Sequence, residues 1–305
     1  MTRIHHHSAF LVFYCMMNSC LQQALADGTP RTGPLVSTLS DCEIHYSVAY
    51  SRYGEPTQSL LADVYRPKGE GPFPTILMLH GGAWFSGNKA HVSLHARHAA
   101  KAGYAVVAIN YRLAPAHKFP KQLDDCRSAL KWIAANSEKY GFDESRVAVY
   151  GYSAGAHLAC LLGVTQNEPT QHGSHLKAET TATIRAIVAG GAPCEFSWIA
   201  SDSERLAFWL GGSRDKMPNV YAAASPITFV DEKDPPTFFF HGKADRIVPI
   251  SSAQKMRQQL EAKGVPSNFH TVLDANHLGA FVNSDARKRA IEFLDSQLKQ
   301  TKPEE

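Results

Sequence analysis

Short apolar runs alternate along the chain with segments whose apolar residues follow helical spacing. The runs are rich in β-branched and aromatic residues and occupy residues 75–79, 105–109, 147–150, 184–189, 237–240 and 269–273. Continuous apolar runs of this kind predict strands that are buried on both faces, as in a parallel sheet. The intervening segments 123–136 and 252–264 are predicted helices that end at Asn136 and Gly264. The alternation therefore predicts an α/β fold with a mostly parallel central sheet and helices on both faces.

The start of the chain departs from this alternation, because residues 41–51 and 59–67 predict an antiparallel pair of strands. The composition, 44% hydrophobic and 19% charged, is typical of one globular domain, which we place at residues 38–298. Basic and acidic residues number 31 and 28 and are interspersed. A nucleic-acid partner is not expected, since such proteins carry a basic stripe.

The first residues have the three parts of a secretory signal peptide. Arg3 precedes a short apolar stretch at 9–17, and the small residues Ala-Leu-Ala at 24–26 precede Asp27. The stretch is shorter than the roughly 20 apolar residues that span a bilayer. We therefore predict a signal peptide at 1–26, a secreted or periplasmic protein, and no stable membrane insertion after cleavage. Lipoprotein processing at Cys20 is the alternative that the sequence leaves open.

Two segments that flank the predicted domain are polar. Residues 27–37 are rich in Gly, Pro, Thr and Ser and predict a flexible linker, and residues 299–305 predict a solvated tail. Four cysteines follow the leader, namely Cys42, Cys126, Cys160 and Cys194. Cys160 is predicted to be a free buried thiol, and one bridge among the other three stays open. No Cys-x-x-Cys spacing indicates a metal or redox site.

The segment 151–155, Gly-Tyr-Ser-Ala-Gly, follows a predicted strand and precedes an apolar helical pattern. A serine at such a sharp strand-to-helix turn adopts a strained backbone and exposes its hydroxyl above the sheet. Gly151 and Gly155 are small where a side chain would collide with the neighbouring strand and helix. Ser153 is therefore the predicted nucleophile.

A serine hydroxyl needs a base, an orienting acid and an oxyanion hole to act on a carbonyl. His277 follows the last predicted strand and is the predicted base. Asp245 follows the strand at 237–240 and is the predicted acid, because an acid on a different strand end can reach the far imidazole nitrogen. Asp274, three residues before the histidine, is the rival acid.

Residues 80–84, His-Gly-Gly-Ala-Trp, follow the apolar run 75–79. The backbone amides of Gly81 and Gly82, with that of Ala154, are predicted to form the oxyanion hole. Trp84, beside these glycines, and Tyr152, beside the serine, are predicted substrate contacts.

Six segments in order resemble the α/β-hydrolase esterase/lipase family, and within it secreted bacterial esterases grouped with feruloyl and acetylxylan esterases. They are HGGAW at 80–84, NYRLAP at 110–115, FPKQLDD at 119–125, GYSAGAHLA at 151–159, ASPITFV at 224–230 and HGKADRIVP at 241–249. The resemblance implies an α/β-hydrolase fold and the same roles for Ser153, Asp245 and His277. The chain departs from relatives at Leu278, beside the histidine, and at Asn110, where one branch has an acid.

Residues 190–235 interrupt the alternation between two predicted core strands and are predicted to form a small cap over the active site. The segment is rich in aromatic residues, namely Phe196, Trp198, Phe208 and Trp209. These side chains either line an apolar acyl or aryl pocket or only pack the cap onto the core. The pattern leaves both roles open.

Several other residues have simpler structural interpretations. His91, His95 and His98 share a helical face, but no flanking acid or cysteine completes a metal site, so a solvated face is predicted. His80 is predicted to order the Gly-Gly turn through its ring. His157 is predicted to be a satisfied helix residue.

The sequence as a whole predicts a serine carboxylesterase that hydrolyses short-chain acyl or aryl esters through an acyl-enzyme, without a cofactor. The substrate is expected to be a small ester or an acylated polysaccharide. An amide hydrolase on the same scaffold and a non-catalytic binding scaffold are the alternatives. Arg112 with Asp124 or Asp125 is predicted to be a structural ion pair that holds the loop at 110–115.

Overall fold

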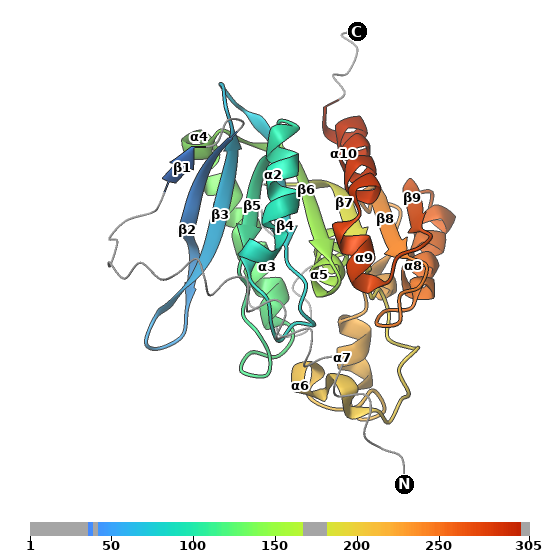
Figure 1. Ribbon diagram of the computed structural model, residues 1–305. Coiled ribbons are helices and arrows are strands. Elements are labelled where there is room, and N and C mark those ends of the chain that lie inside the picture. Colours follow the sequence, from blue (N-terminus) through green and yellow to red (C-terminus); the bar gives the residue numbers. More distant parts are fainter. Residues whose placement is uncertain (1–35, 39–41, 167–181, 300–305) are drawn as a thin grey trace. The chain divides into compact units, whose positions relative to one another are not determined.

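The computed structural model describes residues 36–38, 42–166 and 182–299 (Figure 1). The predicted signal peptide at 1–26, the alternative processing site at Cys20 and most of the predicted linker and tail lie outside these residues. In the part of the chain that is described, no helix is long and apolar enough to cross a membrane.

A nine-stranded sheet forms the centre of the domain, in the order β1-β2-β3-β5-β4-β6-β7-β8-β9. The strands are β1 (Val36–Thr38), β2 (Cys42–Tyr53), β3 (Gln58–Pro67), β4 (Phe73–Leu79), β5 (Ala105–Ile109), β6 (Phe142–Tyr152), β7 (Ile184–Gly190), β8 (Thr237–Gly242) and β9 (Ser267–Val272). Strands β1, β2 and β3 pair antiparallel, and β3 pairs antiparallel with β5. From β5 to β9 all neighbours are parallel.

Helices cover both faces of the sheet (Figure 1). The longer ones are α2 (Ser93–Lys101), α3 (Lys121–Ala135), α5 (Ala154–Val164), α8 (Ile250–Ala262) and α10 (Ser284–Leu298). The shorter ones are η2 (Lys89–Val92), α4 (Ser137–Tyr140), η3 (Glu204–Leu206), α6 (Ala207–Leu210), α7 (Pro218–Ala223), η4 (Pro226–Phe229) and α9 (His277–Val282).

Alternation along the strands divides the apolar side chains between two cores. On β4, Leu77 and Leu79 belong to the core that holds α3, α5 and α8, whereas Ile76 and Met78 belong to the core that holds α2, α9 and α10. Successive strand residues point to opposite faces, so a central strand must be apolar at every position. Helix α5 is buried along its whole length, which explains why its sequence lacks a polar face.

The predicted α/β-hydrolase class is confirmed, and each predicted strand is present within a few residues of its expected bounds. The predicted linker extended too far. Val36 and Ser37 lie in β1, where they pair with His45 and Ile44. Backbone hydrogen bonds to a neighbouring strand, rather than the composition of the segment, determine the conformation of these two residues. Lys299, assigned to the tail, is the C-cap of α10, and its Nζ lies 2.7 Å from Asp295 Oδ1.

Asp234 precedes β8 and is only 9% exposed. Its Oδ2 accepts a hydrogen bond of 2.9 Å from the amide of Asp231. Burial, together with the charges of Asp231 and Glu232, raises the pKa of Asp234 to about 7 against the lowering effect of that hydrogen bond. The folded protein therefore holds a proton on Asp234 that the unfolded chain releases at lower pH.

This raised pKa predicts that the free energy of unfolding falls as the pH rises from about 4 to 7, since the unfolded chain loses the proton first. We expect Asp234→Asn to remove that loss. The variant should match the wild type near pH 4 and unfold about 2–4 °C higher near pH 8. Thermal unfolding across this range, with the exposed Glu144→Gln as control, tests it. A gap between variant and wild type that is equally large at both pH values would contradict the assignment.

Candidate active site

Ser153 lies at the junction of β6 and α5, the position expected for a nucleophile. Its backbone has φ 55° and ψ −121°, a conformation that non-glycine residues rarely adopt. The Ser153 amide donates to the carbonyl of Gly190 at 2.8 Å, and its carbonyl accepts from the amide of His157 at 2.9 Å. The serine is thereby held between the end of β7 and the first turn of α5.

Two glycines permit this sharp turn. A Cβ atom on Gly155 would lie 2.2 Å from the carbonyl oxygen of Leu79, and one on Gly151 would lie 2.1 Å from that of Gly155. Both distances are far inside van der Waals contact, so no side chain fits at either position. The roles that the sequence predicted for Gly151 and Gly155 are confirmed.

Asp245 and His277 form a short hydrogen bond. The imidazole Nδ1 of His277 lies 2.6 Å from Asp245 Oδ2. Asp245 follows β8, and His277 is the first residue of α9, which begins after the N-cap Asn276. The structure therefore pairs the histidine with the acid on a different strand end and not with its rival, Asp274.

The Asp245 carboxylate is buried and fully hydrogen-bonded. Its Oδ1 accepts from the amides of Ile247 and Val248 at 2.9 and 3.0 Å. Burial alone would raise the pKa of Asp245, but hydrogen bonds from His241 and His277 outweigh burial and hold the pKa well below its usual range. The carboxylate therefore stays ionised across the range in which a histidine titrates.

His241 is a member of this cluster that the sequence reasoning missed. It lies on β8, is fully buried, and places Nε2 3.1 Å from Asp245 Oδ2. The only signal in the sequence was its position four residues before Asp245, which by itself does not indicate that the side chains meet. A second imidazole on the same carboxylate is a result of the tertiary structure.

The end of β7 brings the histidine and the serine to one place. A Cβ atom on Gly191 would lie 3.0 Å from His277 Cε1, while the neighbouring Gly190 carbonyl accepts from the Ser153 amide. The hydroxyl of Tyr152 donates to the backbone carbonyl of His277. Ser153 and His277 thus flank the same pair of glycines.

The loop after β4 approaches the serine from the other side. A Cβ atom on Gly81 would lie 3.3 Å from Ser153 Cβ. Gly82 has φ +120°, and a Cβ atom there would lie 2.1 Å from the Ser86 carbonyl oxygen. The following residues, Ala83 and Trp84, also have positive φ. Only glycine satisfies the conformation and the space at position 82.

His80 stabilises this loop, as predicted. Its ring is buried, stacks on Tyr111 at a centroid distance of 4.1 Å, and its Nδ1 donates to the Gly81 carbonyl at 2.7 Å. Burial lowers the pKa of His80 to about 4. A neutral ring that is bound to the backbone holds the loop and is not available for proton transfer to a substrate.

The two predicted substrate contacts occupy other positions. Trp84 is 4% exposed, stacks on Trp209 at 3.7 Å, and donates from Nε1 to His157 Nδ1 at 3.3 Å. Tyr152 is 5% exposed, and its hydroxyl is committed to His277. Trp84 thus packs against the segment 190–235, and the Tyr152 hydroxyl holds the backbone of His277. Contact of either side chain with a substrate stays a prediction.

The segment 190–235 is anchored by the same aromatic residues. Trp209 is fully buried, and its Nε1 donates to Gln122 Oε1 at 3.1 Å. His157 Nε2 donates to the Ala224 carbonyl at 2.6 Å, which ties α5 to this segment. Figure 1 shows α6 and α7 beyond the ends of the parallel strands. Packing of the segment onto the core therefore accounts for Trp209. Both ring nitrogens of His157 are hydrogen-bonded, which confirms the prediction for this helix residue.

The solvated helix face predicted for His91, His95 and His98 is wrong at its centre. His95 is 2% exposed, its Nδ1 accepts from the Tyr150 hydroxyl at 2.9 Å, and its Nε2 donates to the Phe281 carbonyl at 3.0 Å. Two buried partners compensate the ring for the loss of water. Among the described residues, no group of His, Cys, Asp and Glu could hold a metal ion.

The predicted ion pair at the 110–115 loop is confirmed, with Asp125 as the partner. Arg112 Nη2 lies 2.6 Å from Asp125 Oδ1, and Nε lies 3.0 Å from Oδ2. Cys160 is a free buried thiol, as predicted, and no disulfide joins it to the buried cysteines at 42, 126 and 194. These features support the fold around the site without entering it.

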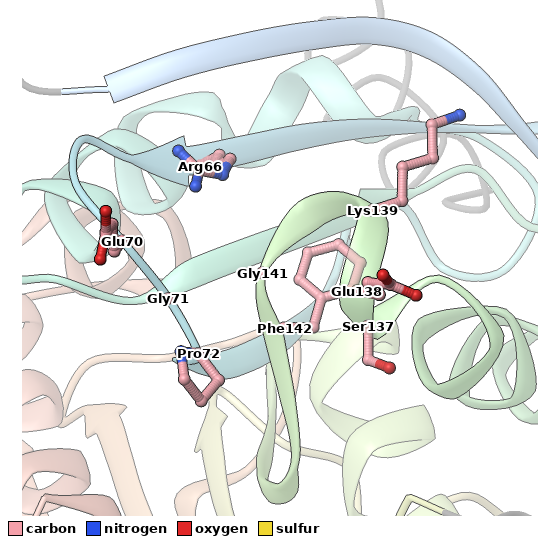
Figure 2. Close-up of a pocket in the computed structure, with 9 residues that line it drawn as sticks. All are labelled: Arg66, Glu70, Gly71, Pro72, Ser137, Glu138, Lys139, Gly141 and Phe142. Carbon is pink, nitrogen blue, oxygen red and sulfur yellow. The ribbon is translucent and has the colours of Figure 1, made fainter.

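A hollow elsewhere on the surface, shown in Figure 2, is lined by Arg66, Glu70, Gly71, Pro72, Ser137, Glu138, Lys139, Gly141 and Phe142. Phe142 begins β6, whereas Ser153 follows its last residue, so the hollow lies at the other end of this strand from Ser153. No imidazole lines it. It contributes nothing to the acid–base cluster.

Proteins named as esterases are similar to this chain in sequence. Esterase LipC of Mycobacterium tuberculosis is 34% identical over 222 residues, which cover 69% of this chain and 54% of LipC. The probable carboxylic ester hydrolase LipM of the same organism is 31% identical over 76% of this chain and 56% of LipM. The chain thus spans about half the length of the relatives it matches.

Solved structures share the fold. A truncated carbohydrate esterase from gut microbiota has a TM-score of 0.75 and 24% identity, covering 88% of this chain and 100% of that one. Esterase B from Lactobacillus rhamnosis has a TM-score of 0.74 and 20% identity, covering 96% of each chain. A family model described as BD-FAE matches residues 62–260, well over half of the sequence. The chain therefore belongs to the BD-FAE family of α/β-hydrolases.

Proposed function

We propose that this protein is a serine carboxylesterase in which Ser153, His277 and Asp245 form the catalytic triad. The observation that carries the proposal is that a strained serine and an Asp–His hydrogen bond of 2.6 Å follow the ends of the parallel strands β6, β8 and β9. The relatives named as esterases support hydrolysis of carboxylic esters.

In this mechanism Ser153 Oγ attacks the ester carbonyl while His277 removes its proton. The imidazolium then protonates the departing alcohol, and Asp245 stabilises the positive ring without accepting the proton itself. Water, activated by the same histidine, releases the acid from the acyl-enzyme. The depressed pKa of Asp245, which hydrogen bonds from two imidazoles maintain against burial, keeps the negative charge in place throughout.

Backbone amides stabilise the tetrahedral intermediate. Ala154 is the first residue of α5, where the amide has no acceptor within the helix. Gly81 lies against Ser153, and Gly82 follows it in the same loop with a positive φ. We assign the oxyanion hole to the amides of Gly81, Gly82 and Ala154. Donors of this kind contribute about 3–4 kcal/mol each to the transition state.

The substrates proposed are short-chain acyl or aryl esters, among them acyl groups on polysaccharide. Two structural relatives are named as a carbohydrate esterase and as an acetyl ester-xyloside bifunctional hydrolase, which supports the second class. We also propose export of the protein, on the strength of the leader pattern at 1–26.

Replacement of the nucleophile tests the triad. Ser153→Ala should lower kcat by about a million-fold, because no other group can form the acyl-enzyme. The matched control is Ser145→Ala, an exposed serine on the same strand β6. Initial rates on p-nitrophenyl acetate measure both variants, and substantial turnover by Ser153→Ala would falsify the assignment.

Replacement of the acid tests whether Asp245 or its rival Asp274 orients His277. Asp245→Asn leaves the side chain nearly unchanged in size but favours the wrong histidine tautomer, so kcat should fall about 10⁴-fold. Asp274→Asn, the rival acid, should retain wild-type kcat. A large loss in the second variant and none in the first would transfer the role to Asp274.

The substrate class is tested with p-nitrophenyl esters from acetyl to palmitoyl, with methyl ferulate and with acetylated xylan. We expect rates that depend on Ser153 and fall steeply beyond short acyl chains, because the segment 190–235 contains only short helices with which to cover a long acyl chain. Serine-dependent release from xylan or ferulate identifies the polysaccharide class. Cleavage of anilides faster than that of the matching esters would instead identify an amide hydrolase.

A further inference from the structure

Two imidazole nitrogens lie against a single carboxylate oxygen of Asp245. Oδ2 lies 2.6 Å from His277 Nδ1 and 3.1 Å from His241 Nε2, while Oδ1 accepts two backbone amides. A triad needs only one of these imidazoles. The second, His241, is buried and has no surface from which it could reach a substrate.

The neighbours of His241 define which nitrogen carries its proton. Nε2 lies 3.0 Å from the carbonyl oxygen of Val248 as well as 3.1 Å from the carboxylate. Both partners only accept hydrogen bonds, so Nε2 must carry a hydrogen. Nδ1 is buried and has no partner among the described residues. A second hydrogen there would be a buried donor without an acceptor, so the neutral Nε2–H form fits this site best.

His241 also connects the loop of Asp245 to the sheet. The ring belongs to β8, whereas Asp245 and Val248 lie in the connection between β8 and α8. Nε2–H binds the Val248 carbonyl from the strand side, and the Val248 amide binds Asp245 Oδ1 from within the loop. Removal of this donor leaves Asp245 Oδ2 held by His277 alone.

We propose that His241 is a positioning residue of the triad, a neutral donor that fixes Asp245 Oδ2 in the orientation that His277 requires and shares the negative charge of that oxygen. The inference rests on the proposed function of Ser153, His277 and Asp245. The titratable groups that face this cluster are the two imidazoles, the carboxylate and the hydroxyl of Tyr152, which binds the His277 carbonyl.

Loss of the His241 donor should shift the pH dependence of kcat/KM in one direction. When the His241 donor is absent, Oδ2 keeps more negative charge for His277 and stabilises its protonated form more strongly. The acidic limb of the kcat/KM profile, below which His277 is protonated and inactive, then moves to higher pH. A role in packing alone lowers stability and leaves this limb in place.

Two amide variants isolate the donor. In His241→Gln the amide nitrogen occupies nearly the place of Nε2, and in His241→Asn that of Nδ1, which faces away from Asp245. We expect His241→Asn to lower kcat by about 10–100-fold with little change in KM, because the acid loses its orientation. The same variant should move the acidic limb of the kcat/KM profile to higher pH. Gln should recover most of kcat and the wild-type limb. His45→Asn is the control, because β2, which carries His45, lies near the opposite edge of the sheet from β8.

The readouts are ester hydrolysis against pH, thermal unfolding, and the rate at which a fluorophosphonate labels Ser153. Labelling reports on serine activation without an ester substrate, so a protein that labels but cleaves no ester contradicts the proposed function and still tests His241. Equal losses in Asn and Gln with an unmoved limb, or wild-type kcat in Asn, would overturn the positioning role. A wild type that does not label at Ser153 overturns both proposals.

The protonation of His241 is accessible without any variant. In protein labelled with ¹⁵N at histidine, the His241 ring should show the neutral pattern with hydrogen on Nε2 near pH 7. This result is independent of whether either variant folds. A doubly protonated ring, or hydrogen on Nδ1 alone, would contradict the assignment of a neutral donor to Asp245.

Discussion

The site depends on one steric constraint, the close approach of β4, β6 and α5 where the strands end. The backbone of Gly155 passes so near the carbonyls of Leu79 and His80 that a Cβ atom would lie within 2.6 Å of either oxygen. This approach forces Ser153 into a positive φ, a strain of about 1–3 kcal/mol that the surrounding structure must hold. The buried helix α5 and the parallel pairing of β4 with β6 supply that support.

The remaining parts of the site are fixed by neighbours of this junction. The Gly190 carbonyl binds the Ser153 amide, and Gly191 leaves space for His277 and Tyr152. His157, one turn into α5, accepts from Trp84 and donates to Ala224, which connects the loop after β4, the helix α5 and the segment 190–235. Burial lowers the pKa of His157 to about 4 despite that hydrogen bond, so this connection is a neutral one.

Asp245, unlike His157, is buried in its charged form. Asp245 is buried, and burial alone would favour its neutral form, yet four donors retain the charge. Such a carboxylate costs no reorganisation when the histidine becomes positive, because its hydrogen bonds already exist in the resting site. The amides of Ile247 and Val248, which donate to Asp245 Oδ1, therefore stabilise both the loop and the charge that the proposed chemistry requires.

The sequence by itself determined the fold class and the strands and placed Ser153 at a strand-to-helix turn, because buried strands and such turns leave local patterns of apolar residues and glycine. It also led to Asp245 and His277 as candidates. Only the tertiary structure paired His277 with Asp245 and not with Asp274, buried the side chains of His95, Trp84 and Tyr152, and brought His241 to the acid. These outcomes depend on which side chains meet across distant strands, and periodicity along the chain carries no information about such contacts.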